Sequence, residues 1–414
     1  MSMPAQQPAP SSLSNERFDV IVVGGGVYGL MCCLEAARRR LRPLLVERSE
    51  IGSGTTGNSL RIIHGGLRYL QDLDLRRFSE SVQERRWFLR HFPDLVEPLP
   101  CLMPLYNEGP RRTSVMRAAL ALNDALSARR NVGVRESRRL PRGRIVGPDE
   151  VRRIFPGVEV RDLRGGAVWF DGFSPKLPQL LAELRSWCEA MGTVVLEQVE
   201  ACGLMESGGR VRGVLATDLV RASRLEFQSA CVINAAGPWA QRFARDCGHD
   251  VPSLFAPSLA WNLGFRRPAP ADHALAVRAR RRGAQTYFLA PWEGRLVAGT
   301  GHAPWSGGVD TPELCPDRMA RFLAELNEAA PSLELRMEEV EHAYVGLLPA
   351  RHAGTEEVAT RDVIYNHGAR GGPAGFWSLI GIKLTTARRA AEKAVCQAFP
   401  GSTPIPESEF RRPT

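Results

Sequence analysis

The stretch FDVIVVGGGVYGLMCCLEAARRR, residues 18–40, decides the fold class. It opens with a short β-branched run that is typical of a strand buried on both faces. Gly24, Gly26 and Gly29 follow in GxGxxG spacing, and apolar residues at helical spacing come next. A glycine turn of this kind lets a pyrophosphate approach the N-terminus of a helix. The stretch therefore predicts a dinucleotide-binding α/β unit.

The next residues complete this pattern. Residues 43–47 (PLLVE) read as a second strand that ends in an acid, Glu47, 18 residues beyond Gly29. At about this spacing a carboxylate can hydrogen-bond the adenosine ribose of the cofactor. The fingerprint by itself does not distinguish FAD from NAD.

The loop after Glu47 favours FAD. At this point an NAD enzyme usually continues into another strand–helix unit, whereas residues 52–60 (GSGTTGNSL) are small and rich in hydroxyl groups. Their backbone amides and hydroxyls can approach a second part of a long, flat cofactor. The candidate cofactor contacts in this region are Arg48, Thr55, Thr56, Asn58 and Ser59.

Three separated motifs resemble the FAD-dependent glycerol-3-phosphate dehydrogenases. They are GTTGNSLRIIHGGLRYLQ at 54–71, VINAAGPW at 232–239 and GIKLTTAR at 381–388. The resemblance covers about residues 18–399 and places the chain in the wider D-amino-acid-oxidase-like (DAO) group of flavoproteins. It implies FAD as the cofactor, a Rossmann-like α/β domain of the glutathione-reductase type and a discontinuous substrate domain with a mixed sheet.

The resemblance also implies roles for individual residues. His64 would lie along the flavin, where an imidazole can act as a base. Arg68 would face the substrate anion, because a guanidinium stays charged and can bind two oxygens. Lys383 would support negative charge on the reduced flavin, at the start of a helix for which Thr385 and Thr386 are suitable caps. An anchoring role for His64 and a surface position for Arg68 are the alternative interpretations.

We therefore expect His64, Arg68 and Lys383 to be catalytic. Further cofactor contacts, besides the residues named above, are expected from His64, Gly65, Gly66, Ala235, Gly237, Lys383, Leu384 and Thr385.

Several positions depart from the substrate-side motifs of the family. Leu348 stands where the family has its second anion-binding arginine, and Arg351 follows three residues later. The segments 173–177, 259–264 and 299–302 differ as well. The cofactor motifs are thus kept while the phosphate-side motifs are altered. This pattern predicts a drier pocket and argues for a substrate other than glycerol 3-phosphate itself.

The order of the motifs predicts a discontinuous domain organisation. The FAD-binding domain is expected to comprise residues 18–95, 146–248 and 340–400, and the substrate domain residues 96–145 and 249–339. Residues 1–17 are rich in Pro, Ser and Gln and are expected to be disordered, and 401–414 are expected to form a C-terminal tail. We expect the protein to lack the C-terminal helical domain of the family.

Composition restricts the partners. The net charge of +9 favours anionic partners, such as a nucleotide cofactor, an acidic substrate or an anionic membrane surface. No nucleic-acid-binding signature is found, so we expect no nucleic acid. The nine cysteines form no CxxC pair, which indicates reduced thiols and no metal site in a cytoplasmic protein. No apolar run approaches the roughly 20 residues of a membrane-spanning helix, and peripheral contact at the inner face of the membrane is left open.

Together these features favour a flavoenzyme that oxidises a C–OH group of a small-molecule substrate by hydride transfer to FAD. The substrate class is a polyol phosphate or another polar or anionic hydroxy compound. The electron acceptor is left open among a quinone, a protein and oxygen. An amine or amino-acid oxidase of the same wider group, and a non-catalytic flavin-binding protein, are the alternative hypotheses.

Overall fold

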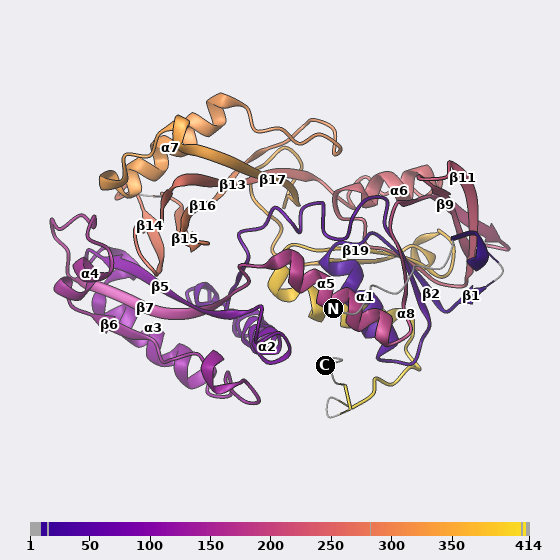
Figure 1. Cartoon of the computed structure of the whole chain (residues 1–414), viewed down its shortest axis with the longest axis horizontal. Helices are drawn as coiled ribbons and strands as arrows, with labels where there is room; N and C mark the ends of the chain where they lie inside the picture. Colours follow the sequence, from indigo (N-terminus) through magenta and orange to yellow (C-terminus); the bar gives the residue numbers. More distant parts are fainter. Residues whose placement is uncertain (1–9, 15, 282, 407–408, 411–414) are drawn as a thin grey trace.

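The computed structural model describes residues 10–14, 16–281, 283–406 and 409–410, which form two lobes (Figure 1). The helices are α1 (Val27–Ala37), α2 (Leu75–His91), α3 (Thr113–Leu126), α4 (Pro148–Ile154), α5 (Leu177–Ala190), α6 (Ala240–Asp246), α7 (Pro316–Ala329) and α8 (Ala387–Ala398). None of these helices is long and apolar enough to cross a membrane.

A six-stranded sheet forms the centre of one lobe. Its order is β18 (Val363–Asn366), β19 (Phe376–Ile380), β12 (Val232–Asn234), β2 (Val20–Val23), β3 (Pro43–Val46) and β8 (Val194–Leu196). All neighbours from β19 to β8 are parallel, and only the edge strand β18 is antiparallel. Val20 and Val22 face one core, whereas Ile21 and Val23 face another. The expected strand that is buried on both faces is thus confirmed.

Two layers cover this sheet. Helices α1, α5 and α8 pack together on one face. The other face packs against a four-stranded sheet of β1 (Arg17–Phe18), β11 (Ser223–Ser229), β10 (Arg210–Asp218) and β9 (Val199–Ser207). The hairpin turn expected at 207–209 joins β9 to β10. This arrangement is a doubly covered parallel sheet, as the glycine turn after its first strand predicts.

A large mixed sheet forms the other lobe (Figure 1). Its order is β17 (Val340–Pro349), β13 (Pro257–Pro268), β16 (Arg295–Pro304), β15 (Thr286–Trp292), β14 (Ala274–Arg278), β5 (Glu97–Leu105), β7 (Gly165–Phe173) and β4 (Ile62–Ile63), and β6 (Arg144–Val146) pairs with β7. Only the β14–β5 pair is parallel. The expected hairpin around 291–294 is the β15–β16 turn, and the expected helix at 317–330 is α7.

The sheets divide the chain differently from the ranges expected from the sequence. Strands β7 and β17 lie in ranges expected to belong to the cofactor domain, yet both pair within the large sheet. Strand β7 pairs along its whole length with β5, because the apolar side chains of both strands bury each other. We propose that the domain boundaries follow the sheets, with 165–173 and 340–349 in the substrate domain.

The described residues near both ends of the chain pack against the rest of the protein. Residues 1–9 and 15 of the stretch expected to be disordered lie outside the described residues. Residues Pro10–Leu13 form a 3-10 helix, because Leu13 packs into the core beside β11. Near the other end, Phe410 stacks on Trp187 with 4.5 Å between ring centroids, and the Ile405 N–H donates to the Arg38 carbonyl. The C-terminal segment therefore packs on α1 and α5.

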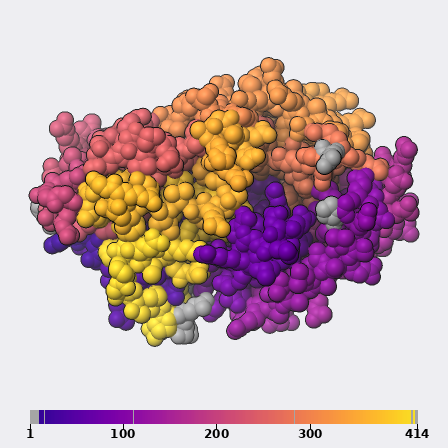
Figure 2. All heavy atoms as spheres, turned by 180° about the vertical axis from the view of Figure 1, so that it is seen from behind, coloured from indigo at the N-terminus to yellow at the C-terminus, as the bar shows by residue number. Residues whose placement is uncertain are grey.

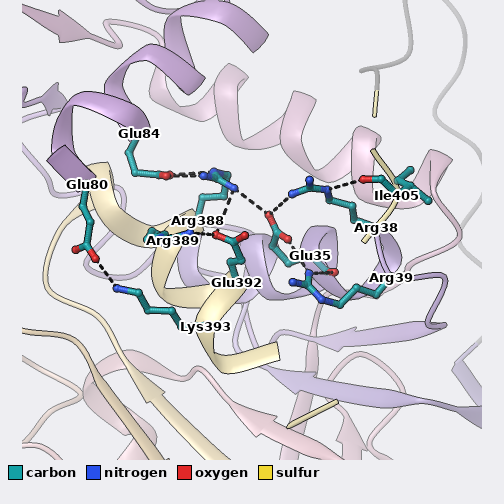
Figure 3. Close-up of polar contacts among 10 residues, drawn as sticks. All are labelled: Glu35, Arg38, Arg39, Glu80, Glu84, Arg388, Arg389, Glu392, Lys393 and Ile405. Atoms are coloured by element: carbon teal, nitrogen blue, oxygen red, sulfur yellow. Dashed lines mark hydrogen bonds and ion pairs between the residues drawn. The ribbon is translucent and has the colours of Figure 1, made fainter. Parts of the chain in front are cut away.

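A network of buried charges joins three helices of the cofactor-side lobe (Figure 3). Arg388 on α8 donates to both carboxylate oxygens of Glu84 on α2, at 2.5 and 2.9 Å. The same guanidinium reaches Glu35 on α1 at 3.2 Å, and Glu35 also accepts from Arg39 at 2.8 Å. Burial raises the pKa of Glu84, and Arg388 opposes this effect. The charge of Arg388 therefore offsets part of the cost of burying this carboxylate and fixes α8 against α2.

Replacing Arg388 with Met should destabilise the protein by about 3–5 kcal/mol, because Glu84 would be left buried without its partner. The control Arg76→Met removes an exposed ion pair with Glu80 and should cost less than about 1 kcal/mol. Urea unfolding of both variants measures the difference. Equal stability of the two variants would show that the buried network contributes nothing.

Candidate active site

A cavity of about 990 Å³ lies where the two lobes meet, at the upper end of the usual size of ligand sites. Figure 2 shows a face on which N-terminal (purple), central (orange) and C-terminal (yellow) parts of the chain come together. The cavity is lined by three segments far apart in the sequence: the turn after β2, the loop at 52–64 and the turn at 381–385. One wall comes from β13, β16 and β17 of the large sheet.

The glycine turn places the N-terminus of α1 at the cavity. Gly24 has φ +104°, and a Cβ on it would lie 2.8 Å from the Ala235 carbonyl oxygen. A Cβ on Gly29 would lie 1.8 Å from the Gly24 carbonyl oxygen, so only glycine allows the helix to close on the turn. Gly26 differs, since its Cβ would meet only the Thr56 hydroxyl, at 3.2 Å. Gly26 therefore meets no backbone and lines the cavity.

Glu47 fixes the shape of this turn. Its carboxylate accepts hydrogen bonds from the Gly25 N–H at 2.5 Å and the Ser49 N–H at 2.8 Å. The neighbouring Arg48 guanidinium lies 4.3 Å from the Trp239 ring centroid and 3.5 Å from Asp310. This end of the cavity is closed by contacts between a strand end of one lobe and the loop after β16.

The polar loop uses its side chains mainly to hold itself in place. The Thr56 hydroxyl accepts from the Val27 N–H at 3.2 Å, and the Thr55 hydroxyl donates to the Leu347 carbonyl at 3.3 Å. The Asn58 carbonyl accepts from the Asn262 amide at 2.9 Å. The Ser59 hydroxyl is buried and has no hydrogen-bond partner. The loop is thus anchored to both lobes, and one of its polar groups is left for a ligand.

Asp171 on β7 positions His64. One carboxylate oxygen accepts from the Gly65 N–H at 2.7 Å and Arg85 at 2.8 Å. The other lies 3.2 Å from His64 Nδ1 and 3.3 Å from Trp169 Nε1. Burial alone raises the pKa of Asp171, but the hydrogen bond and charge of His64, the charge of Arg85 and the Gly65 N–H together lower it to about 2. An ionised Asp171 requires the proton of a neutral His64 to sit on Nδ1.

Tyr28 holds the turn at 381–385, called the late turn below, against the glycine turn. Its hydroxyl donates to Asp362 at 2.9 Å and accepts from the Ile382 and Lys383 N–H groups at 3.0 and 3.1 Å. Burial raises the pKa of Tyr28, and the neighbouring charge of Asp362 raises it further. Tyr28 therefore stays neutral and can both donate and accept.

Lys383 and Thr385 differ from the expectation in their local contacts. The Lys383 ammonium is exposed and contacts the Tyr69 hydroxyl. The Thr385 hydroxyl accepts from the His64 N–H at 3.1 Å, and Thr386 makes no side-chain cap to α8. The expected capping by these threonines was wrong, because a 3-10 turn at 384–386 precedes α8 and directs Thr385 to the loop.

The wall from the large sheet is mostly neutral. Asn262, Thr300 and His302 line it, and burial lowers the pKa of His302 to about 4, so its imidazole is uncharged at neutral pH. Leu348 also lines the wall. Arg351 does not reach it; this arginine is exposed and lies 3.7 Å from Glu357. Arg351 therefore does not replace a cation at position 348.

Most of the residues expected at the site lie on this one cavity. They are Gly24, Gly26, Glu47, Arg48, Thr55, Thr56, Asn58, Ser59, His64, Arg68, Ala235, Gly237, Lys383, Leu384 and Thr385. Gly29, Gly65 and Gly66 do not line it. Gly29 packs on the turn, Gly65 lies against the Arg85 guanidinium, and Gly66 has φ +83°.

Comparison with known proteins decides the family. The model of the family DAO, FAD dependent oxidoreductase, matches residues 19–387. The chain belongs to this family. It is 29% identical over 404 residues to the glycerol-3-phosphate dehydrogenase of Synechocystis, covering 94% of this chain and 71% of the relative. It is 25% identical to the alpha-glycerophosphate oxidase of Streptococcus pyogenes, covering 82% of this chain and 55% of that protein.

A solved structure shares the fold of this FAD-dependent oxidoreductase. The glycerol-3-phosphate dehydrogenase of Bacillus halodurans, complexed with FAD, superimposes with a TM-score of 0.73 at 20% identity. The match covers 96% of this chain and 68% of that one. The chain thus spans between about half and about seven tenths of the length of these three proteins. The expected fold class, α/β with a Rossmann-like FAD-binding part and a mixed sheet, is confirmed.

FAD is the cofactor of this family, and the cavity residues fit it. The cavity at Gly26 beside the α1 N-terminus suits a pyrophosphate, and the unpartnered Ser59 hydroxyl offers a polar contact. Among the described residues, the cysteines form no disulfide, and no cluster of side chains that could hold a metal ion occurs.

Sequence reasoning missed several residues of the site. Tyr28 and Asp362 lie 334 positions apart, and no local pattern pairs them. Asp171 had a signal, because it is an acid within an otherwise apolar strand, GGAVWFDGF at 165–173. Such a residue is buried and must be paired, which marks it as a candidate for a structural or catalytic role.

Replacing Gly26 with Leu should leave the apoprotein folded but prevent FAD retention, because the side chain would fill the cavity without meeting the backbone. Gly29→Ala is the contrasting variant and should destabilise the apoprotein itself. Melting temperature of the apoprotein and flavin absorbance after reconstitution measure the two effects. A Gly26→Leu protein that retains a full complement of FAD would contradict this assignment.

Proposed function

We propose that this FAD-dependent oxidoreductase oxidises a C–OH group of a polyol phosphate or another polar or anionic hydroxy compound. The names of the two relatives support the reaction class. The observation that carries the proposal is the Asp171–His64 pair, in which buried Asp171 holds the cavity-lining His64 as a base in one orientation. FAD, when bound, supplies the hydride acceptor.

His64 is proposed to take the proton of the substrate hydroxyl. Since Asp171 is ionised and faces Nδ1, the lone pair of the neutral ring lies on Nε2. Asp171 also stabilises the imidazolium that forms when His64 accepts a proton. The Thr385 hydroxyl and the Gly65 N–H fix the backbone beside the ring, so the base is preorganised.

Two cations are proposed to assist. Arg68 lines the cavity and is exposed, and its guanidinium makes no hydrogen bond or ion pair within the described part of the chain. It is therefore available to a substrate anion. Lys383 lines the same cavity close to Tyr69, and its charge favours electron density that accumulates nearby.

Anaerobic reduction tests the function directly. The protein is reconstituted with FAD, and glycerol 3-phosphate, D-lactate, glycerol and glycine are added separately while visible absorbance is followed. Bleaching by a hydroxy compound is the expected result. Bleaching by glycine alone would establish the amine-oxidising alternative, and repetition with oxygen or a quinone would identify the acceptor.

Asp171→Asn should lower kcat by about 10²- to 10⁴-fold, since the amide no longer fixes the proton of His64 on Nδ1. Asp246→Asn is the matched control, because Asp246 also lines the cavity but pairs only with exposed Arg245. Rates are measured per bound flavin, so loss of folded protein does not enter the comparison. A folded, FAD-loaded Asp171→Asn enzyme with unchanged kcat would exclude the His64–Asp171 pair as the base.

A further inference from the structure

Four arginines are buried among the described residues, and three of them hold a carboxylate. Arg39 lies 2.8 Å from Glu35, Arg85 2.8 Å from Asp171, and Arg130 3.3 Å from Asp124. The fourth buried arginine is Arg61.

Arg61 is 8% exposed, yet it forms no ion pair within the described residues. A buried cation without a counter-ion is costly, so its retention points to a charge that the chain itself does not supply.

The protein contacts of Arg61 satisfy only part of its guanidinium. Nη1 donates to the Pro175 carbonyl at 2.7 Å, and the group stacks 3.5 Å from the Trp292 ring centroid. Nε is buried and has no acceptor. Burial lowers the pKa of Arg61, and the nearby Tyr344 and Glu293 raise it. An arginine guanidinium remains charged at neutral pH.

Glu293 is near enough to act on this charge, but it forms no ion pair with Arg61. Arg61 lines the same cavity as His64 and as the neutral Asn262, Thr300 and His302. The other cavity cations are occupied or exposed: Arg48 and Arg242 contact Asp310, Lys383 contacts Tyr69, and Arg68 is exposed. Arg61 is thus the buried cation of the described cavity wall that forms no ion pair.

We propose that Arg61 binds the anionic group of the substrate, a phosphate or a carboxylate. This inference rests on the proposed function and specifies where the substrate anion lies. Arg61 interacts with Trp292 and Tyr344, and Tyr344 precedes Leu348 by four residues on β17, about 13 Å along the strand. The anion is therefore placed beside Arg61 on the cavity wall, away from the apolar Leu348.

Equilibrium binding to the oxidised, FAD-reconstituted protein tests this role without turnover. Inorganic phosphate, acetate and neutral glycerol are titrated separately by calorimetry, with flavin absorbance as a second readout. Arg61→Gln should weaken binding of the preferred anion by about 10- to 100-fold and leave glycerol binding within about twofold. The stronger of the phosphate and acetate arms identifies the anionic group.

Arg351→Gln is the matched control, since it removes an exposed arginine outside the cavity and should change neither anion nor glycerol binding. Arg61→Met keeps an unbranched side chain but removes the charge, and it decides the case if Arg61→Gln does not fold. Weaker anion binding at an unchanged melting temperature supports the proposal.

Unchanged anion affinity in a folded Arg61→Gln or Arg61→Met protein overturns the proposal. Equal loss of anion and glycerol binding also overturns it, because Arg61 would then be a structural clamp, and so does a wild-type protein that binds neither anion. A wild-type protein that binds an anion through Arg61 but is reduced by no hydroxy compound would refute the proposed function alone.

Discussion

The carboxylate of Asp171 is the interaction on which the arrangement of the site depends. It accepts from four donors: the Gly65 N–H, Arg85, His64 and Trp169. These donors come from the loop, from α2 and from β7, so a single buried charge ties the polar loop to the large sheet. Because the same loop is bound to the late turn through Thr385, both lobes are held around one cavity.

Among the described residues, the other buried arginines are matched by carboxylates of the chain. Arg388 joins α8 to α2 and α1 through Glu84 and Glu35, which fixes the helices behind the sheet. Pairing of this kind limits the cost of burying ions. Arg61 is the exception, and it lies on the cavity wall where a ligand can supply the missing charge. The paired ions therefore stabilise the fold, whereas we propose that the unpaired Arg61 binds the substrate.

Local sequence patterns predicted individual helices and strands, but they did not predict which distant strands pair with one another. The β-branched run and glycine turn predicted β2 and α1, because backbone conformation there depends on residues a few positions apart. Strands β7 and β17 were assigned to the other lobe. Their place in the large sheet depends on pairing with β5 and β13, which no local signal contains. The threonines at 385–386 follow helix-cap chemistry, but a 3-10 turn redirects the first of them to His64.

The sequence by itself determined the FAD-binding fold, the family and the set of segments that line the cavity, because glycine spacing, strand burial and motif order are local properties of the chain. Only the tertiary structure decided which side chains act together. The pairing of Tyr28 with Asp362, the pairing of His64 with Asp171 and the lack of an ion pair at buried Arg61 arise when residues far apart in sequence share one buried volume. In such a volume the cost of an unmet charge or hydrogen bond decides which contacts form.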